Sequence, residues 1–211
     1  MPVRILSVER FGADELLATL RRTRLRGYDG AELYARASLE LVPAADPDSF
    51  TPAQNYVLAP GVDKALELRA ALLAEGVDLF SLDGGVHVTT SDDPGERIPV
   101  LPPIVEESRE PDGRTVLLVN DGMHRVFAAR RLGLPISAVV VRSVPAEYPY
   151  YAFALAGGWP DVVVLDELPD GHQKKEYRQP TSYKALFRDF NALFPGVQKQ
   201  RRRTNPSHLT L

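Results

Sequence analysis

The chain of 211 residues contains no cysteine, which excludes disulfide bonds, thiolate metal ligands and cysteine nucleophiles. It also has no run of about 18 apolar residues, the length that a membrane-spanning helix requires. Its first residues lack the basic segment and long apolar run of a signal peptide. With 44% hydrophobic and 25% charged residues, the composition is typical of a globular protein with a substantial core. We therefore expect a cytoplasmic protein without a membrane span.

The small net charge of −3 conceals an uneven distribution. Residues 172–211 contain nine Lys and Arg against two acidic residues, a balance of +7 that leaves −10 for the rest of the chain. A basic C-terminal region indicates either a polyanionic partner or a tail that folds back onto its own acidic domain, and both readings stay open. The four histidines, at positions 87, 124, 172 and 208, lack the close spacing of a zinc site.

Helical and strand patterns interleave along the chain and predict a mixed α/β fold. Asp63 is the expected cap of the clearest helix, and Gly76 its terminator. Residues 115–144 have the length of one parallel strand–helix–strand unit. A strand from Ile104 is expected to be short or at an edge because Pro102 and Pro103 precede it. The predicted elements are helices at 13–24, 63–75, 123–132 and 181–194, and strands within 31–42, from 104, at 115–119 and at 136–144, the last buried on both faces.

The stretch VNDGMHRVFAARRLG, residues 119–133, joins an apolar strand to an alanine-rich helix. A helix N-terminus leaves backbone amides unpaired and carries partial positive charge, so it favours an anion. Gly122 allows a sharp turn and a close ligand approach, and His124 and Arg125 add side-chain donors. Phosphate is the simplest ligand that uses every part of this turn.

Asp121 needs a separate explanation, because a carboxylate repels a bare phosphate. It fits if it holds a metal ion that accompanies a nucleotide, accepts a proton from a hydroxyl group, or orients His124. The alternative is that Asp121 caps the helix while Arg125 pairs with a surface carboxylate.

This turn resembles the phosphate-binding motif of the ParB/sulfiredoxin-like fold. Its Asp-Gly-X-His-Arg spacing is most similar to the free serine kinase branch, and the order of elements over residues 36–144 is similar too. The resemblance implies an N-terminal helical extension at 1–35 and a C-terminal elaboration with a basic tail at 145–211. Met123 stands where sulfiredoxins have their cysteine and ParB partition proteins their glutamate, and no helix-turn-helix is evident after Val144. Sulfiredoxin chemistry is thus excluded, and a partition role is not expected.

The resemblance to the kinase branch implies ATP or ADP with Mg²⁺, its phosphates held by Gly122, His124 and Arg125. Asp121 would act as a catalytic acid/base and metal ligand. The kinase-like relatives place another acid just after the first core strand, which selects Glu40 as a second catalytic residue. The expected function is an ATP/ADP-dependent phosphotransferase or nucleotide hydrolase with an unknown small-molecule acceptor.

Two other functions stay open. One is a nucleic-acid-binding protein or ParB-like nuclease that uses the basic C-terminal region, including Lys174, Lys175, Arg178 and residues 201–203. The other is a module that binds a nucleotide without turnover. A second acid–glycine–histidine cluster at 83–87 is either a lid over the nucleotide or, as the favoured interpretation, a hairpin turn before a strand. The aromatic stripe at 183–194 is interpreted as core.

Overall fold

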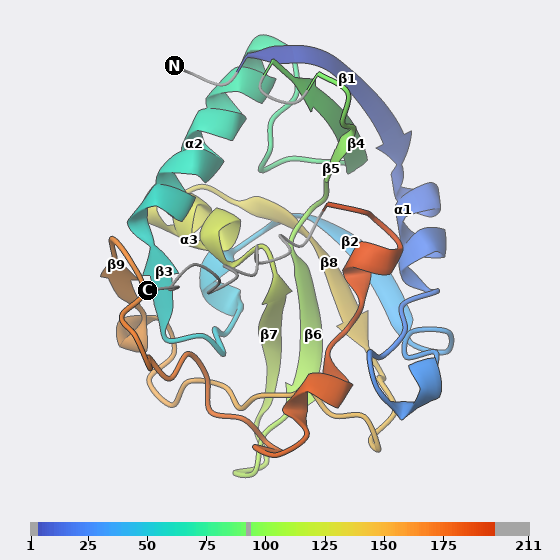
Figure 1. Ribbon diagram of the computed structural model, residues 1–211, viewed down its shortest axis with the longest axis vertical. Helices are drawn as coiled ribbons and strands as arrows, with labels where there is room; N and C mark the ends of the chain where they lie inside the picture. The colour runs from blue at the N-terminus through green and yellow to red at the C-terminus, as the bar shows by residue number, and fades with distance from the viewer. Residues whose placement is uncertain (1–3, 92–93, 197–211) are drawn as a thin grey trace, which may run out of the picture.

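The computed structural model describes residues 4–91 and 94–196 (Figure 1). It confirms the mixed α/β fold, with three helices and three small sheets. In these described residues, no helix is both long enough and apolar enough to cross a membrane.

The main sheet has four strands in the order β2-β8-β6-β7. They span Ser38–Ala45 (β2), Ile136–Arg142 (β8), Ile104–Arg109 (β6) and Thr115–Asp121 (β7). β8 runs antiparallel to β2 and parallel to β6, which pairs antiparallel with β7. The prediction of a parallel unit over 115–144 was therefore wrong: β7 runs opposite to β8, and the parallel pair is β6 and β8. β6 and β7 form an antiparallel hairpin, and the helix after β7 leads to β8. The parallel partner of β8 is therefore β6, and not the strand directly before the helix.

Two smaller sheets flank the main one. The first has the order β1-β4-β5, with β1 at Ile5–Gly12, β4 at Gly84–Thr90 and β5 at Ile98–Val100, and the second pairs β3 (Tyr56–Leu58) with β9 (Val163–Leu165) in parallel. The N-terminal extension is thus not purely helical, because β1 pairs along its length with β4. The glycines of the 83–87 cluster lie inside β4 rather than in the expected hairpin turn. A Cβ at Gly84 would lie 2.1 Å from the backbone carbonyl oxygen of Phe11 on β1, so this position requires glycine.

The helices are α1 (Ala13–Leu20), α2 (Ala59–Ala74) and α3 (Met123–Arg131). α2 begins four residues before the expected Asp63 cap: Leu58 is its N-cap, and a proline lies in its first turn. Proline is favoured there because its fixed φ suits a helix start and its missing N–H is not needed.

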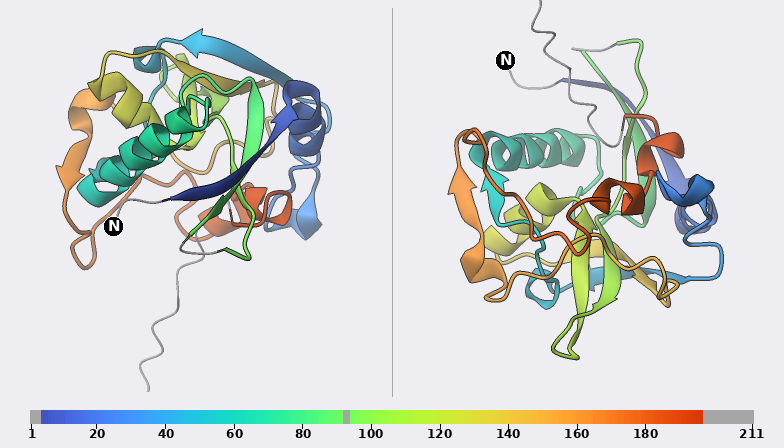
Figure 2. Two further views of the ribbon diagram at one scale, coloured as in Figure 1. Left: turned by 90° about the horizontal axis from the view of Figure 1, so that it is seen from above. Right: turned by 60° about the horizontal axis from the view of Figure 1, so that its bottom comes forward.

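Side chains of β8 alternate between two hydrophobic clusters, which confirms the strand buried on both faces. Ala138 and Val140 belong to the cluster that contains residues of α2 and α3, whereas Val139 and Val141 belong to the cluster that contains residues of α1 and the C-terminal segment. The main sheet is therefore covered on both sides, as the further views in Figure 2 show.

The C-terminal segment differs from its prediction. Instead of a helix at 181–194, two short 3₁₀ turns form, at Tyr183–Leu186 and Phe190–Ala192. Between them the chain is extended and pairs with residues 24–26 through backbone hydrogen bonds. The apolar spacing was nevertheless informative, since Leu186, Phe190 and Phe194 are buried in the core as interpreted.

Candidate functional site

The turn between β7 and α3 forms the N-terminus of a helix whose N-cap residue has no capping side chain. Gly122 is its N-cap in the left-handed conformation, with φ 87°, and no side chain caps the helix. A Cβ at Gly122 would lie 2.9 Å from the Cβ of Pro103 and 3.0 Å from an Nη atom of Arg125. Glycine is therefore required here by conformation and by space. The alternative that Asp121 caps α3 is wrong.

Asp121 and Arg125 form an internal ion pair one helical turn apart. Arg125 donates to Oδ2 of Asp121 at 2.7 Å and also to the carbonyl of Leu101. The two side chains are only 16% and 17% exposed, so the carboxylate partner of Arg125 is not a surface residue as the alternative supposed. Because a guanidinium carries five N–H donors, Arg125 can hold these partners and still donate to an anion.

His124 links the turn to the start of α2. Its Nε2 accepts a hydrogen bond from the backbone N–H of Leu58 at 3.1 Å. A Cβ at Gly61 would lie 2.6 Å from the imidazole, so glycine allows α2 to approach the ring. An accepting Nε2 means that, in this geometry, only Nδ1 of His124 can donate. The N-termini of α2 and α3 therefore meet at His124, whose imidazole accepts from the N-cap N–H of α2, whereas neither N-cap residue, Leu58 or Gly122, has a capping side chain of its own.

Glu40 is not brought to this turn. It lies on β2, exposed, where it pairs with Arg142 at 3.3 Å. β8 and β6 separate β2 from β7, the strand that ends at Asp121. Three strand spacings, roughly 14 Å, therefore lie between Glu40 and β7. The structure thus places Gly122, His124, Arg125 and Asp121 together and leaves Glu40 apart.

The donors at the turn do not suit a magnesium ion held by the protein. Mg²⁺ prefers several oxygen ligands in octahedral geometry. Asp121 is already paired with Arg125, and no group of three or more His, Asp or Glu able to hold a metal occurs within residues 4–91 and 94–196. We assign no step to a metal ion bound by Asp121.

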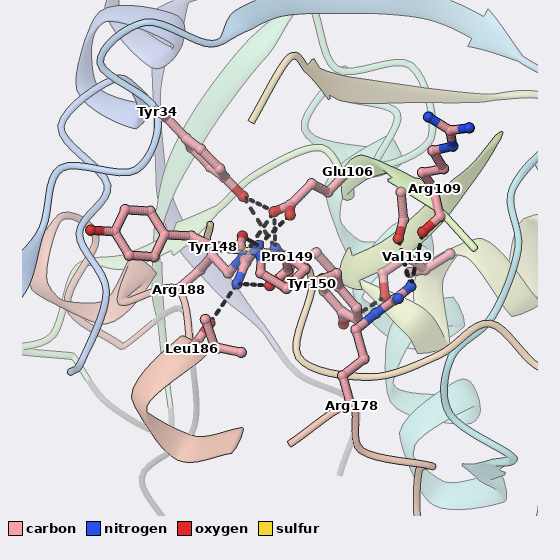
Figure 3. Close-up of polar contacts among 12 residues, drawn as sticks. Tyr34, Glu106, Arg109, Val119, Tyr148, Pro149, Tyr150, Arg178, Leu186 and Arg188 are labelled. Atoms are coloured by element: carbon pink, nitrogen blue, oxygen red, sulfur yellow. Dashed lines mark hydrogen bonds and ion pairs between the residues drawn. The ribbon is translucent and has the colours of Figure 1, made fainter. Parts of the chain in front are cut away.

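Two of the basic residues expected to contact nucleic acid, Lys175 and Arg178 (the latter in Figure 3), have internal partners. Arg178 pairs with Glu110, whose side chain is 4% exposed. Lys175 donates to the hydroxyl of Tyr151 at 2.6 Å and of Tyr150 at 3.2 Å. Residues 201–203 lie outside the described part of the chain. Phosphodiester binding by this region stays a prediction.

A buried polar network beside the turn has no counterpart in the sequence analysis. Glu106 on β6 accepts two hydrogen bonds from Arg188 of the C-terminal segment and one, at 2.7 Å, from Tyr34 (Figure 3). Asn120, next to Asp121, donates to the Tyr34 hydroxyl at 3.2 Å. Burial, reinforced by the Glu106 carboxylate, raises the pKa of Tyr34 well above its usual value. No local signal marked Glu106 in advance, because β6 reads Ile-Val-Glu-Glu-Ser-Arg and three further polar residues follow Glu106 in the same strand.

Comparison with known proteins places this arrangement in a family. The model of the ParB CE domain matches residues 15–163, well over half of the chain, and spans both helices that meet at His124. No curated protein and no solved structure matches the chain. The chain belongs to the ParB-like family defined by the ParB CE domain.

Proposed function

We propose that the protein binds the phosphate groups of a nucleotide, ATP or ADP, at the turn formed by residues 121–125. The observation that carries the proposal is the meeting of two helix N-termini at His124 beside Arg125, with Gly122, the N-cap of α3, providing no capping side chain. Each terminus contributes partial positive charge, and Arg125 adds a full charge with spare donors. The resemblance to the kinase branch supports a nucleotide as the source of the phosphates.

Asp121 has two effects in this proposal. Its carboxylate competes with the incoming phosphate for Arg125, so it lowers affinity. Of the two predicted catalytic acids, Asp121 and Glu40, it is also the one that lies at the turn. There it can accept a proton from an attacking hydroxyl group or water. Phosphoryl transfer to a small acceptor or hydrolysis would therefore depend on Asp121 and not on Glu40.

Titration calorimetry with ATP, ADP and CTP tests the binding site. Arg125→Ala should lower the affinity at least about tenfold, since a hydrogen bond to a charged group contributes about 1.5–3 kcal/mol. Arg131→Ala is the matched control, because Arg131 lies exposed in the last turn of the same helix. Arg125→Lys keeps the positive charge that faces Asp121, so this variant should stay folded. A loss of affinity in it cannot be attributed to misfolding. Unchanged affinity in both Arg125 variants would contradict the proposal.

Asp121→Asn separates the two effects of the carboxylate. This variant should bind nucleotide more tightly than the unaltered protein, because a competitor for Arg125 has been neutralised. Release of phosphate from ATP, with or without an added acceptor, should fall to the background rate. Weaker binding in Asp121→Asn would contradict competition, and undiminished turnover would exclude Asp121 as the acid/base residue.

A further inference from the structure

A second concave site lies away from the turn. A cavity of about 620 Å³ is lined by the segment from Arg22 to Glu32 and by residues of the C-terminal segment. This volume falls within the roughly 300–1,000 Å³ of small-molecule sites. Its apolar lining, Leu25 and Leu193, belongs to the hydrophobic cluster of α1 and the C-terminal segment, whereas α3 belongs to the other cluster.

Three arginines line this cavity in alternating positions, Arg22, Arg24 and Arg26. The backbone at 23–26 bonds on one side to residues 31–33 and on the other to residues 187–189, as the middle strand of a small sheet would. Thr23 and Leu25 are buried, while the three arginines between and beside them are exposed. The alternation of an extended backbone therefore directs the side chains of Arg24 and Arg26 to one side, and Arg22, in the turn after α1, lines the same cavity.

The charges in the cavity are incompletely balanced. Arg24 pairs with Glu32 at 2.8 Å, and Arg26 lies 3.9 Å from Asp189. No described carboxylate pairs with Arg22. Arg24 retains further donors because one of its Nη atoms contacts Glu32 and a guanidinium has five N–H groups. The cavity thus offers one uncompensated cation, spare donors and two carboxylate acceptors.

One part of the cavity lining is conformationally strained. Tyr28, Asp29 and Gly30 have φ values of 51°, 52° and 68°, and Gly30 lines the cavity. Two successive non-glycine residues in the left-handed region are strained, and such strain concentrates at binding sites. Tyr28 is nonetheless 43% exposed, so deep burial of its side chain does not account for the conformation.

We propose that this cavity binds a small hydroxylated phosphate compound of the sugar phosphate class. Its phosphate is held by Arg22 and the spare donors of Arg24, because guanidinium groups match phosphate oxygens. Glu32 and Asp189 accept hydrogen bonds from its hydroxyl groups, and the apolar lining contacts its carbon skeleton. The proposal is independent of nucleotide binding at residues 121–125.

Titration calorimetry of the full chain with ribose 5-phosphate, ribose and inorganic phosphate tests the site. Ribose 5-phosphate should bind more tightly than either part alone, and Arg22→Gln should weaken it about tenfold by removing a charge-assisted hydrogen bond. The affinity of Arg22→Lys for ribose 5-phosphate should lie between those of Arg22→Gln and the unaltered protein. Arg109 is exposed and lies outside the cavity, so Arg109→Gln should bind as the unaltered protein does. Circular dichroism checks that each variant folds.

Four results would overturn the proposal. Equal affinities for ribose 5-phosphate and inorganic phosphate would show that the hydroxyl groups do not contribute to binding. Binding lost in Arg125→Ala but kept in Arg22→Gln would assign the ligand to the turn. Tighter binding of an oligothymidylate that depends on Arg22 would favour a nucleic-acid strand, and no heat with ribose 5-phosphate would exclude the site. Failure of nucleotide binding at Arg125 leaves the test at Arg22 unaffected.

Discussion

Replacing Arg188 by Met should destabilise the whole domain, because Arg188 is the buried link between the C-terminal segment and the main sheet. Its side chain is 0% exposed and Glu106 is 1% exposed. Besides the two-pronged contact with Glu106, Arg188 donates to the carbonyls of Tyr148, Pro149 and Leu186. Methionine fills a similar volume but can satisfy none of these groups.

The expected loss is about 3–5 kcal/mol in the free energy of unfolding, the cost of leaving one member of a buried ion pair without its partner. That loss is a large part of the total of about 5–15 kcal/mol typical of a folded domain. The penalty arises from the stranded carboxylate of Glu106 more than from the lost attraction. Removing both charges should therefore cost much less: the double variant Glu106→Leu, Arg188→Met should recover at least about half of the loss.

Urea unfolding followed by circular dichroism measures these differences as shifts in the midpoint. Arg109→Met is the matched control: it lies exposed on the same strand as Glu106 and should change the free energy of unfolding by no more than about 0.5 kcal/mol. A loss below about 1 kcal/mol in Arg188→Met, or a double variant no more stable than the single one, would refute a stranded buried charge as the cause.

Two further predictions concern titration. The hydrogen bond from Arg69 lowers the pKa of Asp78, so Asp78→Asn should reduce stability above the unfolded pKa of about 3.9, and the difference should vanish as pH falls through the lower folded pKa. Urea midpoints against pH check this, with the exposed Asp83→Asn as control, and a difference that persists in acid would contradict it. Burial opposes ionisation of Tyr151, but the charge and hydrogen bond of Lys175 outweigh it and lower its pKa. Lys175→Met should raise that pKa, measured by phenolate absorbance, and an unchanged titration would sink the assignment.

The sequence predicted elements best where the signal was local. β8 was evident because a β-branched run needs cover on both faces, and α3 because an alanine-rich segment follows a glycine. The start of α2 was misplaced because Asp63 is a good cap in isolation, while Pro60 already fixes the first turn. The expected helix at 181–194 did not form, since its backbone pairs instead with residues 24–26, a distant partner that periodicity does not reveal.

The same distinction between local and distant information applies to the site. The proximity of Gly122, His124 and Arg125 was predictable from one turn, because a strand-to-helix junction brings them together locally. The partners that set their geometry lie far along the chain: Leu58 for His124, and Leu101 for Arg125. Glu40 was selected by its place after a strand, but strand order decides which acids meet, and β2 lies at the opposite edge of the sheet from β7.

The ion pair between Asp121 and Arg125 explains how a guanidinium group is held at the positive end of α3. The Arg125 side chain lies in the first turn of α3 and is largely removed from water, so without Asp121 its charge would be poorly compensated. In the proposed function, an incoming phosphate would exchange one anion for another at Arg125, so the net gain in binding free energy would be smaller than the contacts suggest. The carboxylate that compensates Arg125 would then also limit the affinity for phosphate, and the change in affinity in Asp121→Asn measures this exchange.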